Sequence, residues 1–109
     1  MSFDRAKLFS SNATTEREIT ACGETFTVHV RRLPAIDLRK YYAEVMSPEI
    51  DVRAAAGFDA LSKAIRSADG KPMFTASELR GMYPEAIKAL TEAFTEINTQ
   101  QPDADLGND

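Results

Sequence analysis

Residues 17–32 have the sequence REITACGETFTVHVRR, and this stretch decides the N-terminal part of the fold. Its second half alternates strictly, because Phe26, Val28 and Val30 are apolar and the residues between them are polar. A period of two residues is typical of a strand with one buried face. The stretch therefore predicts a β-strand that ends before Pro34.

The preceding run, residues 18–21, is joined to this strand through Gly23-Glu24. Glycine at the first central position suits a type II′ turn, so these two residues are expected to form the loop of a β-hairpin. That register pairs Ile19 with Val28, Ala21 with Phe26, and Glu18 with His29.

Helical periodicity replaces the alternation after Pro34. The first predicted helix has its apolar stripe at Leu38, Tyr41, Tyr42 and Val45. Ser47-Pro48-Glu49 is typical of a helix start and predicts a second helix, with its stripe at Ala54, Phe58, Leu61 and Ile65. Gly57 lies inside this second helix, where it costs about 1 kcal/mol relative to alanine.

The C-terminal half begins with turn chemistry at residues 69–72, Asp-Gly-Lys-Pro. Thr75 and Glu78 then match a capping box, and Phe74 and Leu79 match the hydrophobic staple that accompanies it, so a short helix is expected up to about Met82. The last predicted helix begins near Pro84, and its stripe consists of Ile87, Leu90, Phe94 and Ile97.

Together these patterns predict an α+β fold that is mainly helical, with an N-terminal β-hairpin followed by about four short helices. Residues 1–99 are expected to form a single domain, in which residues 1–16 are a mobile arm. Residues 100–109 are polar and acidic, which predicts a disordered tail.

Composition narrows the classes of function. The chain has 109 residues, a formal net charge of −4 and no apolar run long enough for a membrane span. Three of the acidic residues lie in the last ten positions, so the remaining body is close to neutral and lacks the basic surface of a nucleic-acid binder. A single cysteine and the lack of a signal-like N-terminus predict a reducing cytoplasm.

Residues suited to catalysis or metal binding are few. His29 is the only histidine and Cys22 the only cysteine; they lie too far apart along the hairpin for a nucleophile and its base. No zinc spacing, phosphate-binding loop or nucleophile elbow is present in the sequence. We therefore expect no enzyme activity, no catalytic residue, no metal and no cofactor.

The apolar stripes of the helices are the remaining candidates for a functional surface. Each stripe is first of all a candidate for the core, but four short helices and a hairpin make a thin structure. Small domains often gain burial by docking a partner or by self-association. At least one stripe is therefore expected to serve an interface.

The order of these features resembles the tail assembly chaperones of long-tailed bacteriophages over residues 17–99. The resemblance rests on the extended Val-His-Val-Arg-Arg-Leu segment at 28–33, the helical middle, and Asp-Gly-Lys-Pro-Met-Phe-Thr at 69–75 followed by a capped helix and an amphipathic helix.

Several expectations follow from the resemblance. It implies a protein of the host cytoplasm that binds the tape measure protein, assists tail tube assembly, self-associates and is absent from the finished virion. It also implies a shorter product of a −1 frameshifted gene, for which Leu106-Gly107-Asn108 is compatible with a slippery site. The residues expected to contact the partner are Phe74, Leu79, Leu90, Phe94 and Ile97.

Two alternatives stay open on the sequence. Two helices joined around residues 69–74 could act as a helix-turn-helix of a small DNA-binding regulator, although the body is near neutral and the turn is long. A minor structural protein of the virion is the other alternative.

Overall fold

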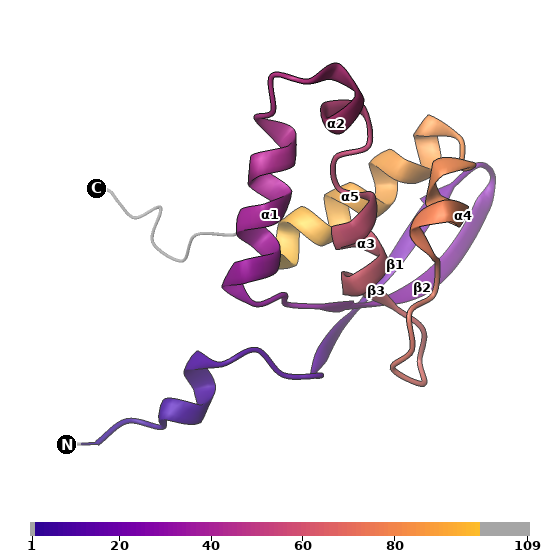
Figure 1. Cartoon of the computed structure of the whole chain (residues 1–109). Helices are drawn as coiled ribbons and strands as arrows, with labels where there is room; N and C mark the ends of the chain where they lie inside the picture. Colours follow the sequence, from indigo (N-terminus) through magenta and orange to yellow (C-terminus); the bar gives the residue numbers. More distant parts are fainter. Residues whose placement is uncertain (1, 99–109) are drawn as a thin grey trace, which may run out of the picture.

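The computed structural model describes residues 2–98 (Figure 1). The elements in chain order are η1 (Arg5–Leu8, a 3-10 helix), β1 (Thr14–Ala21), β2 (Glu24–Arg31), α1 (Ala35–Val45), α2 (Ile50–Ala54), α3 (Phe58–Ala64), β3 (Ile65–Arg66), α4 (Ala76–Arg80) and α5 (Pro84–Asn98). The predicted α+β fold, a hairpin followed by short helices, is confirmed. The predicted tail and the Leu106-Gly107-Asn108 segment lie outside the described residues.

The hairpin forms with a different register from the predicted one. β1 pairs antiparallel with β2 so that Ile19 faces Phe26 and Glu16 faces His29. The loop is Cys22-Gly23 rather than Gly23-Glu24, and both residues have positive φ, 54° and 79°. Positive φ at both central positions defines a type I′ turn, which matches the twist of the flanking strands. The shift of two residues leaves every side chain on its predicted face.

A third strand extends the sheet, and the sequence did not predict it. β3 pairs antiparallel with β2, placing Ile65 opposite Val30 and Arg66 opposite His29. The strand order is β1-β2-β3. Two residues are too few to show any periodicity, so only the partner strand reveals this element.

The prediction of a single second helix is wrong, because this stretch forms two helices, α2 and α3. Between them Gly57 has φ +92°, a left-handed conformation that breaks the helix. A Cβ at this position would lie 3.2 Å from the Tyr41 ring, so α1 approaches the break closely. Ile65, predicted at the end of this helix, instead begins β3.

The start of α4 agrees with the sequence in atomic detail. The Thr75 hydroxyl accepts a bond from the Glu78 amide at 3.0 Å, and the Glu78 carboxylate accepts one from the Thr75 amide at 2.8 Å. The turn before it places Gly70 at φ +85°, with the Gly70 amide bonded to the Ser67 carbonyl. The capping box and the Asp-Gly-Lys-Pro turn are therefore confirmed.

The core lies between one face of the sheet and the helices α3 and α5. Its largest fully buried side chains are Phe94, Ile65, Leu79, Leu90, Val28 and Val30. The other face of the sheet is polar. Helix α1 lies beside α3 at the edge of this core (Figure 1). It has no buried residue, although Leu38 and Tyr41 pack against the core.

The predicted arm, residues 1–16, is shorter than expected. β1 already begins at Thr14, because residues 14–16 pair with the end of β2. The part before the sheet contains η1 and leads away from the body in Figure 1. We use "the arm" below for residues 2–13.

Candidate partner-binding surfaces

The five predicted partner-binding residues lie in or against the core. Leu79, Leu90 and Phe94 are each 1% exposed. Phe74 and Ile97 are partly buried and pack against the same cluster. Contact of the three buried side chains with another protein would require local opening of the domain. Their role in partner binding stays a prediction.

Large apolar side chains are instead exposed along α1 and α2. The α1 stripe divides: Leu38 and Tyr41 pack against the core, whereas Tyr42 and Val45 are 44% and 42% exposed. The exposed pair continues into the next segment. We define the α1–α2 surface as Tyr42, Val45, Met46, Ile50 and Val52, all of which are exposed.

Met46 and Ile50 are the most prominent members of the α1–α2 surface, with exposed fractions of 80% and 71%. Several large exposed apolar side chains on two successive helices make this part of the protein a candidate interaction site. The sequence contained this information, because Tyr42 and Val45 were assigned to a stripe. What it could not show is that only Leu38 and Tyr41 of this stripe pack against the core.

Helix α1 is held in place by ring packing. The Tyr41 ring meets Phe94 edge to face, with 5.2 Å between centroids, and lies against Gly57. Burial raises the pKa of the Tyr41 hydroxyl above its usual value, with the nearby Tyr42 adding to the effect. An aromatic pair of this geometry contributes about 0.5 to 1.5 kcal/mol beyond its buried area.

Charged groups provide the second attachment of α1 to α3. Lys63 donates to Asp37 at 3.0 Å and lies 3.3 Å from Asp59, which Lys40 also contacts at 3.3 Å. The bond to Asp37 is the main reason that the pKa of Lys63 is raised. For Asp59, burial alone would raise the pKa, but the two lysines outweigh it and the pKa is lowered.

The arm carries a second set of exposed apolar side chains. Phe3, Leu8 and Phe9 are 75%, 74% and 61% exposed, and no residue of η1 is buried. The Arg5 guanidinium lies over the Phe9 ring at 5.2 Å. Apart from this contact with Arg5, the three side chains are largely exposed to solvent.

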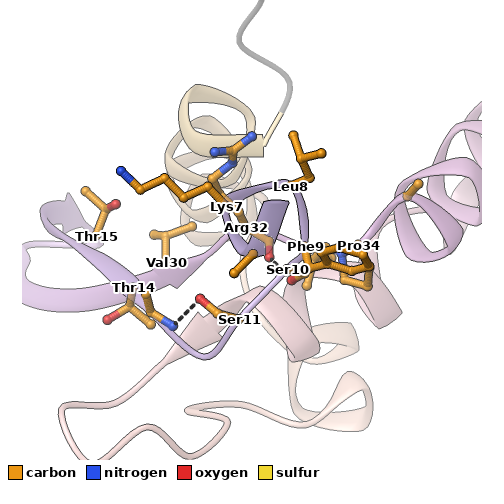
Figure 2. A pocket seen from close by; sticks show the side chains of 14 residues that line it. Lys7, Leu8, Phe9, Ser10, Ser11, Thr14, Thr15, Val30, Arg32 and Pro34 are labelled. Atoms are coloured by element: carbon orange, nitrogen blue, oxygen red, sulfur yellow. Dashed lines mark hydrogen bonds between the residues drawn. The ribbon is translucent and has the colours of Figure 1, made fainter. Parts of the chain in front are cut away.

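The base of the arm is attached to the end of β2. The Ser10 hydroxyl donates to the Arg32 carbonyl, and the Arg31 guanidinium donates to the Ser11 carbonyl, both at 2.8 Å. Between the arm and the body lies a hollow of about 750 Å³ (Figure 2). Its wall combines arm residues with Val30, Leu33 and Pro34. The arm therefore has a fixed base and an uncovered apolar tip.

Asn98 fixes the junction from which both surfaces extend. Its side-chain oxygen accepts from the Leu33 amide at 2.6 Å, and its side-chain nitrogen donates to the carbonyls of Arg31, 3.1 Å, and Phe94, 3.3 Å. The end of α5 is thus joined to the segment between β2 and α1. Sequence reasoning missed this residue, because a polar residue near a helix end gives no indication of a distant partner.

Groups able to do chemistry are dispersed. Cys22 is exposed in the hairpin turn, whereas His29 lies at the other end of β2, opposite Glu16 and Arg66. Within residues 2–98, no cluster of three or more histidine, cysteine, aspartate or glutamate side chains is arranged to hold a metal ion. Over the same residues, no helix combines the length and apolar character needed to cross a membrane.

The helices proposed for a helix-turn-helix are not joined by a tight turn. Residues 65–75 separate α3 from α4, and this connection includes β3, which belongs to the sheet. A helix-turn-helix joins its helices by three or four residues. The arrangement around residues 69–74 therefore differs from that motif.

The geometry defines a small α+β protein with two exposed apolar surfaces. Comparison of the chain with protein-family models, with curated proteins and with solved structures finds no match in any of the three. The function must therefore be argued from the residues of the chain itself.

Proposed function

We propose that this chain is a non-enzymatic tail assembly chaperone of a long-tailed bacteriophage. In this proposal it acts in the host bacterial cytoplasm, binds the tape measure protein, assists polymerisation of the tail tube protein, and is absent from the finished virion. The chain is proposed to be the shorter product of a −1 frameshifted gene.

The observation that supports the proposal is the α1–α2 surface. It presents aliphatic and aromatic side chains, including Met46 at 80% exposure, on α1, α2 and the segment between them, and neither helix has a buried residue. An amphipathic partner helix binds a surface of this kind through apolar residues spaced three and four apart. Methionine suits such a surface because its flexible side chain adapts to different partners.

The electrostatics around the α1–α2 surface favour a partner with basic flanks. Residues 44–53 contain three carboxylates, Glu44, Glu49 and Asp51, and one guanidinium, Arg53. Arg53 is already bonded to the Ser47 carbonyl at 2.8 Å. Charge complementarity of this kind increases the rate and specificity of association more than its affinity.

Co-expression tests the proposal. The tape measure protein encoded near this chain's gene is expressed alone, with the wild-type chain, or with the Met46→Glu/Ile50→Glu variant, and its soluble fraction is measured. We expect the wild-type chain to keep the tape measure protein soluble and the variant to lose this effect. Tyr83→Glu is the matched control, because Tyr83 is 76% exposed and lies outside the α1–α2 surface.

Two results would overturn the proposal. One is a gene neighbourhood without tape measure or tail tube proteins. The other is a tape measure protein that aggregates equally with and without the wild-type chain. Circular dichroism of both variants establishes that the folded domain is intact, which is expected because Met46 and Ile50 make no contribution to the core.

A further inference from the structure

We infer that the hollow between the arm and the body binds the acidic C-terminal segment of the same chain, residues 99–109. This contact is independent of the proposed function, because it involves neither the α1–α2 surface nor another protein. Three features carry it: the cations in the wall of the hollow, the composition of residues 99–109, and the place where α5 ends.

The wall of the hollow contains cations and no carboxylate. Lys7 of the arm and Arg32, which follows β2, are its two charged residues, and all the other residues that line it are uncharged. Both residues are exposed, and neither makes an ion pair within residues 2–98. The arm's own carboxylate, Asp4, already accepts from the Ala6 amide and caps η1. The hollow therefore favours a negatively charged ligand.

Exposed apolar side chains line the same hollow. Leu8 and Phe9 of the arm are 74% and 61% exposed, and Pro34 belongs to the part of the wall that the body supplies (Figure 2). Binding here removes apolar surface from water as well as pairing charges. A ligand that fits the hollow therefore combines carboxylates with at least one apolar side chain.

Residues 99–109 have this composition. Their sequence, TQQPDADLGND, contains the carboxylates of Asp103, Asp105 and Asp109, no lysine or arginine, and one large apolar residue, Leu106. A segment this short and polar cannot form a core of its own, so it becomes ordered only against another surface. The hollow offers such a surface with the opposite charge.

The end of α5 brings this segment to the hollow. Asn98, the last residue of α5, is bonded through its side chain to the Leu33 amide and the Arg31 carbonyl, on either side of Arg32. An extended chain spans about 3.3 to 3.6 Å per residue, so residues 99–103 reach up to about 17 Å from this point. Attachment so close to the hollow gives the chain's own segment a high effective concentration, which a separate molecule lacks.

Occupation of the hollow joins the arm to the body. The arm supplies Lys7, Leu8 and Phe9 to the wall, and the body supplies Arg32 and Pro34. A segment bound between them contacts both parts, so we expect it to restrain the motion of the arm relative to the sheet. Because the ion pairs are exposed, the contact is expected to be weak and to be weakened further by salt.

Paramagnetic NMR of the full chain tests the inference. A nitroxide label is attached at Asn108→Cys in a Cys22→Ser background, so that it reports the position of the C-terminal segment. Broadening is expected for the backbone amides of residues 6–9 and Ala35, which line the hollow. It is not expected for residues 21–24 in the hairpin turn, because they lie at the other end of β1 from the hollow.

Charge reversal identifies the contacts. Lys7→Glu/Arg32→Glu should reduce the broadening at least about threefold, because each exposed ion pair changes an equilibrium by a few-fold. The matched control is Arg39→Glu/Lys71→Glu, which reverses two exposed cations outside the hollow and should leave the broadening unchanged.

Restoring opposite charges is the decisive measurement. Asp103→Lys/Asp105→Lys is combined with Lys7→Glu/Arg32→Glu, so that cations on the segment face carboxylates in the hollow. The broadening should return, which a distorted hollow would not allow. A combined variant without recovery overturns the inference.

Other occupants of the hollow give different results. Broadening of an isotope-labelled chain by the nitroxide of a second, unlabelled chain would assign the bound segment to another copy and overturn the inference. A spin-labelled wild-type segment that causes no broadening also overturns it; shifts of the hollow amides on adding an aspartate tetrapeptide would then assign the hollow to an acidic partner. Lys7→Glu/Arg32→Glu should still keep the tape measure protein soluble, so failure of the proposed function is distinguished from failure of this contact.

Discussion

Replacing Asn98 by alanine should destabilise the domain through one particular amide. Asn98 accepts from the Leu33 amide and donates to the carbonyls of Arg31 and Phe94. Leu33 is only 6% exposed, so its amide has little access to water once the asparagine oxygen is removed. An unsatisfied buried donor costs about 1 to 3 kcal/mol. Losing the two hydrogen bonds to the carbonyls of Arg31 and Phe94 costs less, because these oxygens can accept from water instead.

Helix propensity acts in the opposite direction, since alanine favours a helix over asparagine by up to about 0.7 kcal/mol. We therefore expect Asn98→Ala to lower the free energy of unfolding by about 1 to 2 kcal/mol. Urea titration followed by circular dichroism measures this as a lower midpoint with an unchanged slope. Glu92→Ala, on an exposed position of the same helix, should change stability by less than about 0.5 kcal/mol.

Asn98→Asp separates hydrogen bonding from shape. The carboxylate still accepts from Leu33 but cannot donate to the two carbonyls, and it places negative charge at a helix C-terminus. Its destabilisation should be large at pH 7 and should shrink as the pH falls toward the usual carboxyl pKa of about 3.9, where a protonated acid can donate. The reasoning is refuted if Asn98→Ala costs less than about 0.5 kcal/mol, or if Asn98→Asp shows no dependence on pH.

Three further substitutions test local features. Cys22→Asn should stabilise the domain by about 0.5 to 1 kcal/mol, because asparagine tolerates the left-handed conformation of a type I′ turn better than cysteine does. Urea titration measures this gain, and Cys22→Ala in the same titration should give none. Gly57→Ala should destabilise the domain by about 2 kcal/mol, because of the positive φ and the close Tyr41 ring. In a continuous helix the same substitution would stabilise the domain by about 1 kcal/mol, so the sign of the change in thermal unfolding temperature distinguishes the two cases. Asp59→Asn should cost about 0.5 kcal/mol or less at pH 7, since the side chain is 43% exposed. The pKa of Asp59 is lowered in the folded state, so its contribution is present above the usual value of 3.8 and is lost as the pH falls through the folded pKa. Urea midpoints of wild type and variant should therefore converge as the pH falls from 7 through the folded pKa of Asp59, which lies below 3.8. A difference that stays equal down to the lowest pH at which the domain is folded would contradict the assignment.

Elements that depend only on residues a few positions apart in the chain could be predicted from the sequence. The capping box of Thr75 and Glu78 needs only residues three positions apart, and the stripe of α5 needs only its own period. The hairpin was predicted in kind but not in register. Two adjacent turns, Cys22-Gly23 and Gly23-Glu24, keep the same residues on the buried face, so the hydrophobic pattern cannot choose between them.

Features that depend on distant partners could not be predicted. The Cys22 amide donates to the Glu85 carboxylate at 2.9 Å, a contact between the hairpin turn and α5 that accompanies the observed turn. β3 exists only through its pairing with β2, and the break at Gly57 accompanies the close approach of Tyr41. In each case the tertiary neighbour, not the local sequence, completes the element.

The candidate surfaces follow from the way α1 is attached. Its contacts with the rest of the domain include an edge-to-face ring pair, one partly buried leucine, Leu38, ion pairs to α3, and a hydrogen bond that the Glu44 carboxylate accepts from the Gly57 amide. A stripe that was expected to be buried therefore supplies only Leu38 and Tyr41 to the core, and leaves Tyr42 and Val45 exposed. Since the fully buried core is made by other elements, charge can be introduced at Met46 or Ile50 with little cost to folding. Binding and stability are thus carried by different residues, which allows each proposed contact to be removed from a domain that remains folded.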